Sequence, residues 1–73
     1  MIKIRYTTHA LDRMEQRGIS KGTIIWALKY GEKMYSDENL RKAIYRNKNR
    51  ILIVIYAIKN ANEVEIITTY WES

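Results

Sequence analysis

Cysteine and proline are absent from this chain of 73 residues, and histidine occurs once, at His9. Without cysteine, the chain can form neither a disulfide nor a thiolate-ligated zinc site. The eight acidic residues stand singly or in short pairs, so we expect no metal site and no other cofactor. Because no proline and no low-complexity stretch marks a linker, residues 1–73 are predicted to form a single domain.

A long apolar run is also missing. The longest one, residues 51–58, is far shorter than the ~20 residues that cross a bilayer. The first twenty residues are too highly charged for a signal peptide. We therefore expect a protein that does not enter membranes and that stays in the cytoplasm, a reducing compartment that suits a chain without cysteine.

Positive charge, by contrast, is in excess. Thirteen Lys and Arg residues against eight Asp and Glu residues give a net charge of +5. Such a surface favours a polyanionic partner, namely nucleic acid, an acidic protein or anionic lipid, although it could also serve solubility alone. The core of so short a chain is marginal, and without a disulfide or a metal the remaining support is oligomerisation. We therefore expect a homodimer.

Two helices are predicted in the first half of the chain, after a short alternating strand at residues 2–6. The hydroxyls of Thr7 and Thr8 can cap a helix over residues 9–17, which Gly18 would end in a left-handed conformation. Ser20 can cap a second helix that runs to residue 30 and stops at Gly31. The two would form a helical hairpin.

The second half alternates with the period of β-strands. Strands are predicted over residues 32–35, 40–46, 50–58 and 63–71, with turns at 36–39, 47–49 and 60–62. The strand at 50–58 is apolar on both faces, so it should be central or covered by a partner chain. On the last strand, Val64, Ile66, Thr68 and Tyr70 should share one face. The predicted fold is α+β, with the helical hairpin on one face of a twisted antiparallel sheet of three to four strands.

His9, Arg13 and Arg17 fall within an ~80° arc of the first predicted helix. The neighbouring arc, which should face the core, carries Ala10, Leu11 and Met14. The stripe of three basic residues would therefore run along the edge of the buried face. Two explanations of this four-residue spacing remain open. The three side chains could simply form a solvated, positively charged edge of the helix, or they could bind a phosphate group.

A ribonuclease that uses no metal needs a base, an acid and cations around the scissile phosphate. His9 is the side chain whose ordinary pKa suits proton transfer. Arg13 and Arg17, with Lys42 or Arg46 from the sheet, could bind the phosphate. From the last strand, Tyr70 could donate a hydrogen bond and Trp71 could stack on a base. Packing at the sheet edge is the alternative explanation of both residues, and for Trp71 it is the favoured one.

Trp26 and Tyr30 lie four residues apart on the second predicted helix, opposite its apolar Ile24 and Leu28. An aromatic pair that faces away from the core suggests a partner interface. The alternative is that the N-terminal strand or the C-terminus covers the pair.

The run YTTHALDRMEQRGIS, residues 6–20, resembles the opening signature of domain-of-unknown-function family 4258. That signature has a His-Ala pair, an Arg four residues after the His, and Arg-Gly-Ile-Ser before a second helix. The closing IITTY, residues 66–70, is similar to the terminal strand of the family. The family is grouped by analogy with the barnase–RelE-like ribonuclease fold of the RelE, ParE and BrnT toxins. The resemblance implies a ribonuclease in which His9, Arg13 and Arg17 occupy matched positions, whereas Lys42, Arg46 and Tyr70 match by location only.

Three functions are consistent with these features. The first is a metal-independent endoribonuclease of the toxin type, with RNA as substrate and an acidic antitoxin protein as partner. The second is a non-catalytic module that binds nucleic acid or protein through the same basic surface. The third is a small structural homodimer whose charge is incidental. The clustering of His9, Arg13 and Arg17, together with the family resemblance, favours the first two.

Overall fold

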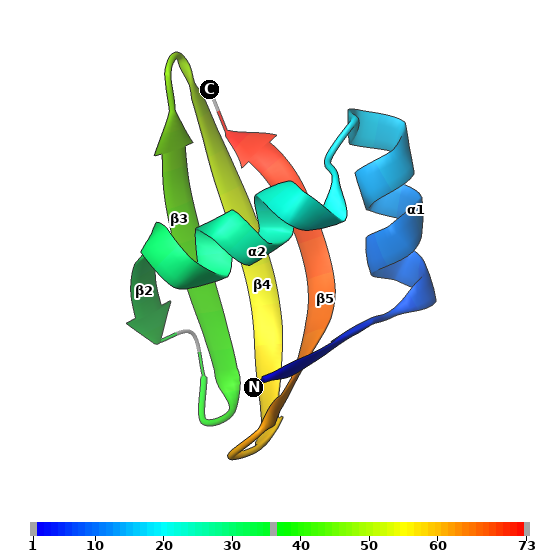
Figure 1. Cartoon of the computed structure of the whole chain (residues 1–73), viewed down its shortest axis with the longest axis vertical. Helices are drawn as coiled ribbons and strands as arrows, with labels where there is room; N and C mark the ends of the chain where they lie inside the picture. The colour runs from blue at the N-terminus through cyan, green and yellow to red at the C-terminus, as the bar shows by residue number, and fades with distance from the viewer. Residues whose placement is uncertain (1, 36, 73) are drawn as a thin grey trace.

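A computed structural model describes residues 2–35 and 37–72, so that Ser36 of the expected turn at 36–39 lies outside the described residues. The elements follow in the order β1 (Lys3–Tyr6), α1 (Thr8–Arg17), α2 (Lys21–Tyr30), β2 (Glu32–Tyr35), β3 (Leu40–Asn47), β4 (Arg50–Asn60) and β5 (Glu63–Glu72). The strands form one sheet with the order β1-β5-β4-β3-β2. In Figure 1, α2 crosses one face of the sheet and α1 runs beside β5. No helix in these two described ranges is long and apolar enough to cross a membrane.

The sheet differs from the predicted one in strand number and direction. It has five strands rather than three to four, and β1 pairs with β5 in parallel, with Ile4 opposite Val64. The other pairs are antiparallel, as expected. Local sequence indicates that residues 2–6 are extended, but parallel pairing joins segments about sixty residues apart, which no local pattern encodes. The α+β class is confirmed, and the purely antiparallel sheet was wrong.

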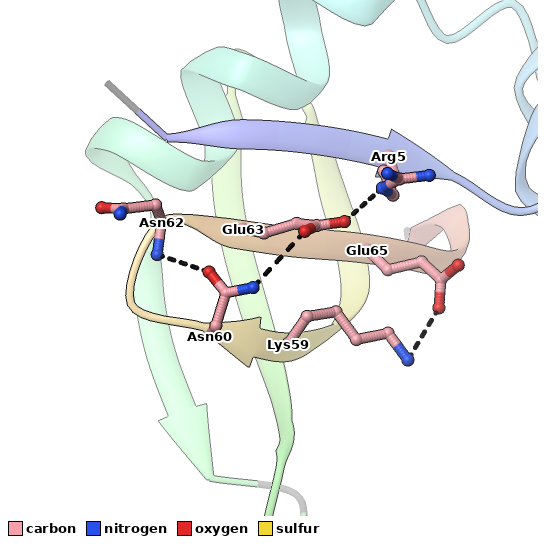
Figure 2. A network of polar contacts seen from close by, with 6 residues as sticks. All are labelled: Arg5, Lys59, Asn60, Asn62, Glu63 and Glu65. Atoms are coloured by element: carbon pink, nitrogen blue, oxygen red, sulfur yellow. Dashed lines mark hydrogen bonds and ion pairs between the residues drawn. The ribbon is translucent and has the colours of Figure 1, made fainter.

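Polar contacts hold β1 against the β4–β5 hairpin (Figure 2). Arg5 forms an ion pair with Glu63, and the Asn60 amide donates to the same carboxylate at 3.4 Å. On the other side of β5, Lys59 of β4 forms an ion pair with Glu65 of β5 at 3.3 Å. These pairs also neutralise two of the cations at this end of the sheet.

The helix boundaries follow the predicted capping residues. Thr7 caps α1 by accepting a hydrogen bond from the Ala10 amide at 2.9 Å, and Ser20 caps α2 by accepting from the Thr23 amide at 3.1 Å. Gly18 ends α1 in the left-handed region, with φ of 66°. Gly31 is required for a different reason: a Cβ there would lie 2.5 Å from the Ala27 carbonyl oxygen and 2.8 Å from that of Ile44. Both helices were therefore predicted to within a residue at each end.

The core fills the face of the sheet on which both helices pack, here called the helix face. Its buried members are Ala10, Met14, Ile19, Ile24, Ala27, Ala43, Leu52, Val54, Tyr56, Val64 and Ile66. Leu11, which was expected in the core, is 43% exposed, because it lies beyond the narrow arc with which α1 contacts β5. The opposite face, on which none of the described residues forms a helix, is called the open face. β4 is central in the sheet, as predicted, and its open-face Ile53 is only 1% exposed.

Candidate functional site

A β-bulge in β5 decides which side chains reach the open face. Ile66 pairs with Tyr56, but the next pair along β4 joins Ile55 to Thr68, so that Ile67 is an extra residue. Bulges of this kind redirect the side chains that follow them. Val64 and Ile66 therefore point into the core with Thr69 and Trp71, whereas Thr68 and Tyr70 lie on the open face. The expectation that Val64, Ile66, Thr68 and Tyr70 share one face was wrong for this reason.

The bulge is tied to the start of α1. Thr7, the residue that caps the helix, accepts from the Ala10 amide through its hydroxyl oxygen and donates the hydroxyl proton to the Ile67 carbonyl at 3.1 Å. The Thr7 amide donates to the Ile66 carbonyl at the same distance. One threonine thus fixes the helix N-terminus and the bulge relative to each other.

This junction brings His9 to the open face. The Nε2 atom of His9 lies 3.1 Å from the hydroxyl oxygen of Thr68, and the two form a hydrogen bond across 59 positions of sequence. His9 is exposed and Thr68 is half-buried, so that both are accessible from solvent. The predicted proton-transfer residue therefore sits against a hydroxyl that the sequence analysis did not assign to the site.

Two predicted residues share the open face with this pair. Tyr70 follows Thr68 by two residues on β5, which separates their Cα atoms by about 7 Å. Lys42 of β3 lies opposite Ile55, which in turn lies opposite Thr68, so that two strand spacings of about 5 Å separate Lys42 from Thr68. Tyr70 and Lys42 therefore lie on the same face as the His9–Thr68 pair, within one or two strand spacings of Thr68.

The two arginines of α1 occupy different places. Arg13 is half-buried, follows His9 by one helical turn and donates to the side-chain oxygen of Gln16 at 2.8 Å. Arg17 donates to the Thr69 carbonyl at 3.0 Å and so bonds the outer edge of β5 beyond the end of β1. This hydrogen bond uses one of the five guanidinium N–H donors of Arg17, and the remaining four can donate to other acceptors.

Arg46 lies further from this group than Lys42 does. It pairs with Ile51, which pairs with Glu72, near the β3–β4 hairpin. Four residues of strand, about 13 Å, separate it from Lys42 on the same face. Among residues 2–35 and 37–72, neither Arg46 nor Lys42 forms an ion pair. Lys42 and Arg46 therefore lie too far apart along β3 to reach the same small group.

The other aromatic residues predicted to be functional, Trp71, Trp26 and Tyr30, lie on the helix face. The Trp71 indole N–H donates to the Arg17 carbonyl at 2.9 Å, and the Arg50 guanidinium stacks on the Trp71 ring at 3.7 Å. Packing at the sheet edge, the simpler explanation of Trp71, is therefore confirmed. Trp26 and Tyr30 are 54% and 62% exposed, and their rings stack with centroids 4.7 Å apart. Neither terminus covers this pair within the described residues.

A hollow with a volume of about 640 Å³ lies on the helix face between α2, β1 and the β4–β5 hairpin. Its lining is largely apolar and includes Ile25, Leu28 and Ile58. Ile25 and Ile58 are 42% and 37% exposed, so that part of this apolar lining is open to solvent. The helix face thus offers a surface of the kind that protein partners use.

Two phenols that pack against the core have perturbed pKa values. Burial raises the pKa of Tyr6 and that of Tyr56 above the ordinary value, and the charge of Arg41 partly offsets the effect at Tyr56. Both phenols lie on the helix face, away from His9. The part of the chain that the structure describes contains no group of three or more His, Cys, Asp or Glu residues able to hold a metal ion.

Comparison with known proteins agrees with this geometry. Residues 6–71 match the family described as a domain of unknown function (DUF4258), which confirms the resemblance read from residues 6–20. No curated protein matches the chain. The crystal structure of the ribonuclease toxin BrnT from Brucella abortus is similar to the present one, with a TM-score of 0.75, 16% sequence identity and coverage of 100% of this chain and 99% of that chain. This likeness confirms that the chain has a toxin-like fold.

Proposed function

This chain belongs to the DUF4258 family, and we propose that it is a metal-independent endoribonuclease of the toxin type. The observation that carries the proposal is the hydrogen bond between His9 and Thr68 on the open face. His9, a residue type suited to proton exchange, thereby contacts a strand position two residues before Tyr70 and two strand spacings from Lys42, which supports the proposal. The likeness in fold to a ribonuclease toxin supports the same reaction class by analogy.

In the proposed reaction, the 2′-oxygen of RNA attacks the adjacent phosphorus. The bond from O2′ to phosphorus forms, the bond from phosphorus to O5′ breaks, and His9 accepts the proton of the 2′-hydroxyl. Arg13 and Lys42 stabilise the negative charge of the phosphorane, Arg17 contributes its remaining donors, and Arg46 binds a neighbouring phosphate. Tyr70 donates a hydrogen bond to the phosphate or to the departing O5′. The O5′ oxygen takes up a proton from solvent water, and His9 returns the proton of the 2′-hydroxyl to solvent, so that the products are a 2′,3′-cyclic phosphate and a 5′-hydroxyl.

The test is cleavage of single-stranded RNA by the purified chain in low salt with EDTA, because the proposal invokes no metal. Replacing His9 by Ala or Gln should slow cleavage by about 10²–10⁴-fold, the usual size of general acid–base catalysis. Asp12→Asn, an exposed change on the same helix, is the control and should leave the rate unchanged. If the wild-type chain neither cleaves nor retains RNA, the proposal fails.

Two adjacent cations of β3 separate specific phosphate binding from general charge. Lys42 lies on the open face, whereas Arg41 points to the helix face, where it stacks on Tyr35 at 4.0 Å. Lys42→Ala should weaken RNA binding. It should also reduce the slope of the logarithm of the binding constant against the logarithm of the salt concentration by about 0.7, the value for one phosphate contact on a single strand. Arg41→Ala removes the same charge and should change the slope little. Equal effects of both would indicate a diffuse basic surface.

The exposed aromatic and apolar surface of α2 favours a second property, the binding of a protein partner. We propose that Trp26 and Tyr30 contact either an acidic antitoxin or a second copy of this chain. Light scattering of the wild type and of Trp26→Ser at micromolar concentration distinguishes the copy from the antitoxin.

Binding of RNA without cleavage, unchanged in the His9 variants, would instead favour a non-catalytic module. A function on RNA also leads us to propose a cytoplasmic location.

A further inference from the structure

A side chain that transfers a proton has to be held in one orientation, since a displacement of about 1 Å can cost about 10²-fold in rate. His9 stands in the first turn of α1 with an exposed side chain, and it is not a member of the buried core. Within residues 2–35 and 37–72, the polar contact of its ring is the bond between Nε2 and the Thr68 hydroxyl. The orientation of the ring therefore depends on Thr68.

We propose that Thr68 is the positioning residue of His9: its hydroxyl oxygen accepts a hydrogen bond from Nε2–H and leaves Nδ1 as the nitrogen that exchanges a proton with RNA. The inference rests on the proposed ribonuclease function. In neutral imidazole one nitrogen donates and the other accepts, whereas in the protonated ring both donate. A hydroxyl that accepts from Nε2–H therefore serves both states of the ring and need not rearrange when Nδ1 gains a proton.

The position of Thr68 does not depend on its bond to His9. The Ile67 carbonyl of the bulge accepts from the Thr7 hydroxyl, and Thr7 belongs to the same helix start as His9. On the far side, β4 pairs with Thr68 through Ile55. In addition, a β-branched side chain has few χ1 conformations. The hydroxyl is thus placed beside His9 by contacts that would remain if the His9 ring were absent.

A positioning role and a direct phosphate-binding role of Thr68 predict different kinetics. If Thr68 orients His9, Thr68→Val should lower kcat by about 10–100-fold with little change in KM, because a small misplacement of a reacting group costs up to about 10²-fold in rate. Thr68→Ser, which keeps the hydroxyl, should restore most of the rate. A rise in KM with unchanged kcat would identify a phosphate ligand and overturn the proposal. Unchanged kinetics in Thr68→Val would also overturn it.

The matched control is Thr8→Val, the same substitution one residue before His9. The side chain of Thr8 is exposed and forms no hydrogen bond to the described residues, so this variant should cleave RNA at the wild-type rate. An equal loss in Thr8→Val and Thr68→Val would show that the rate responds to the helix terminus in general.

A second measurement needs no catalysis. Because His9 is the single histidine, ¹⁵N labelling gives the NMR signals of one imidazole, and its two-bond spectra show which nitrogen carries the proton at alkaline pH. Wild type and Thr68→Ser should hold the proton on Nε2, and Thr68→Val should move toward the mixture of free imidazole. Absence of RNA cleavage in the wild type would refute the proposed function alone. Identical ring spectra in wild type and Thr68→Val would refute the positioning by Thr68.

Discussion

The adjacent residues Thr68 and Thr69 allow a direct test of the bulge, because neighbouring strand residues face opposite sides of the sheet and the bulge decides which of the two faces the core. Thr69 is 0% exposed, and its hydroxyl donates to the Ile53 carbonyl at 2.8 Å. Thr68 is half-buried on the open face. The same substitution by valine, nearly identical in shape to threonine, should therefore destabilise the fold at residue 69 and not at residue 68.

The expected magnitude follows from the single bond that is lost. A buried hydrogen bond contributes about 0.5–1.5 kcal/mol net, and valine fills the same space, so no cavity adds to the cost. At roughly 0.05–0.15 kcal/mol per residue, a chain of 73 residues has a free energy of unfolding of about 4–11 kcal/mol. Thr69→Val should remove about 1 kcal/mol of this, whereas Thr68→Val should stay within about 0.5 kcal/mol of wild type.

Urea denaturation followed by far-UV circular dichroism measures both variants. Thr69→Val should lower the midpoint at unchanged slope, and its Tm should fall by about 4–8 °C. If Thr68→Val is the more destabilised of the two, Thr68 faces the core, the bulge does not act as described, and the proposed site beside His9 loses its basis.

Three further outcomes are expected. Gly31→Ala should lower the free energy of unfolding by about 1–3 kcal/mol, because its Cβ would meet backbone oxygens of Ala27 and Ile44; a urea titration equal to that of the wild type would contradict the close approach. Lys48 has a φ of 55° in the β3–β4 turn, so Lys48→Gly should raise the same free energy by about 0.5 kcal/mol, whereas a loss of stability would show that no strain is relieved. Burial raises the pKa of Tyr6 and that of Tyr56 in the folded state above the pKa in the unfolded chain. The stability that these two neutral phenols contribute is therefore full below about pH 10, and it is lost as the pH rises through their pKa in the folded state. Tyr6→Phe should reduce this fall in the free energy of unfolding at alkaline pH. If urea denaturation of the variant shows the same fall as wild type, other groups cause it.

The sequence alone determined the elements of the fold and one member of the site. Helix caps are local, so Thr7, Gly18, Ser20 and Gly31 marked the helix ends without knowledge of the rest of the chain. Alternating polarity is equally local and located the strands. His9 could be identified because it is the single histidine and because its type has a pKa suited to proton transfer.

Tertiary structure decided how these parts meet. The parallel pairing of β1 with β5 joins distant segments and leaves no local signature. The extra residue at Ile67 is likewise invisible in an uninterrupted run of strand-forming residues, yet it reverses the faces of all residues after it. Periodicity predicted one face for Val64, Ile66, Thr68 and Tyr70, and the bulge turned Thr68 and Tyr70 to the open face, where Thr68 meets His9. Sequence thus supplied the chemical groups, whereas long-range pairing supplied their geometry.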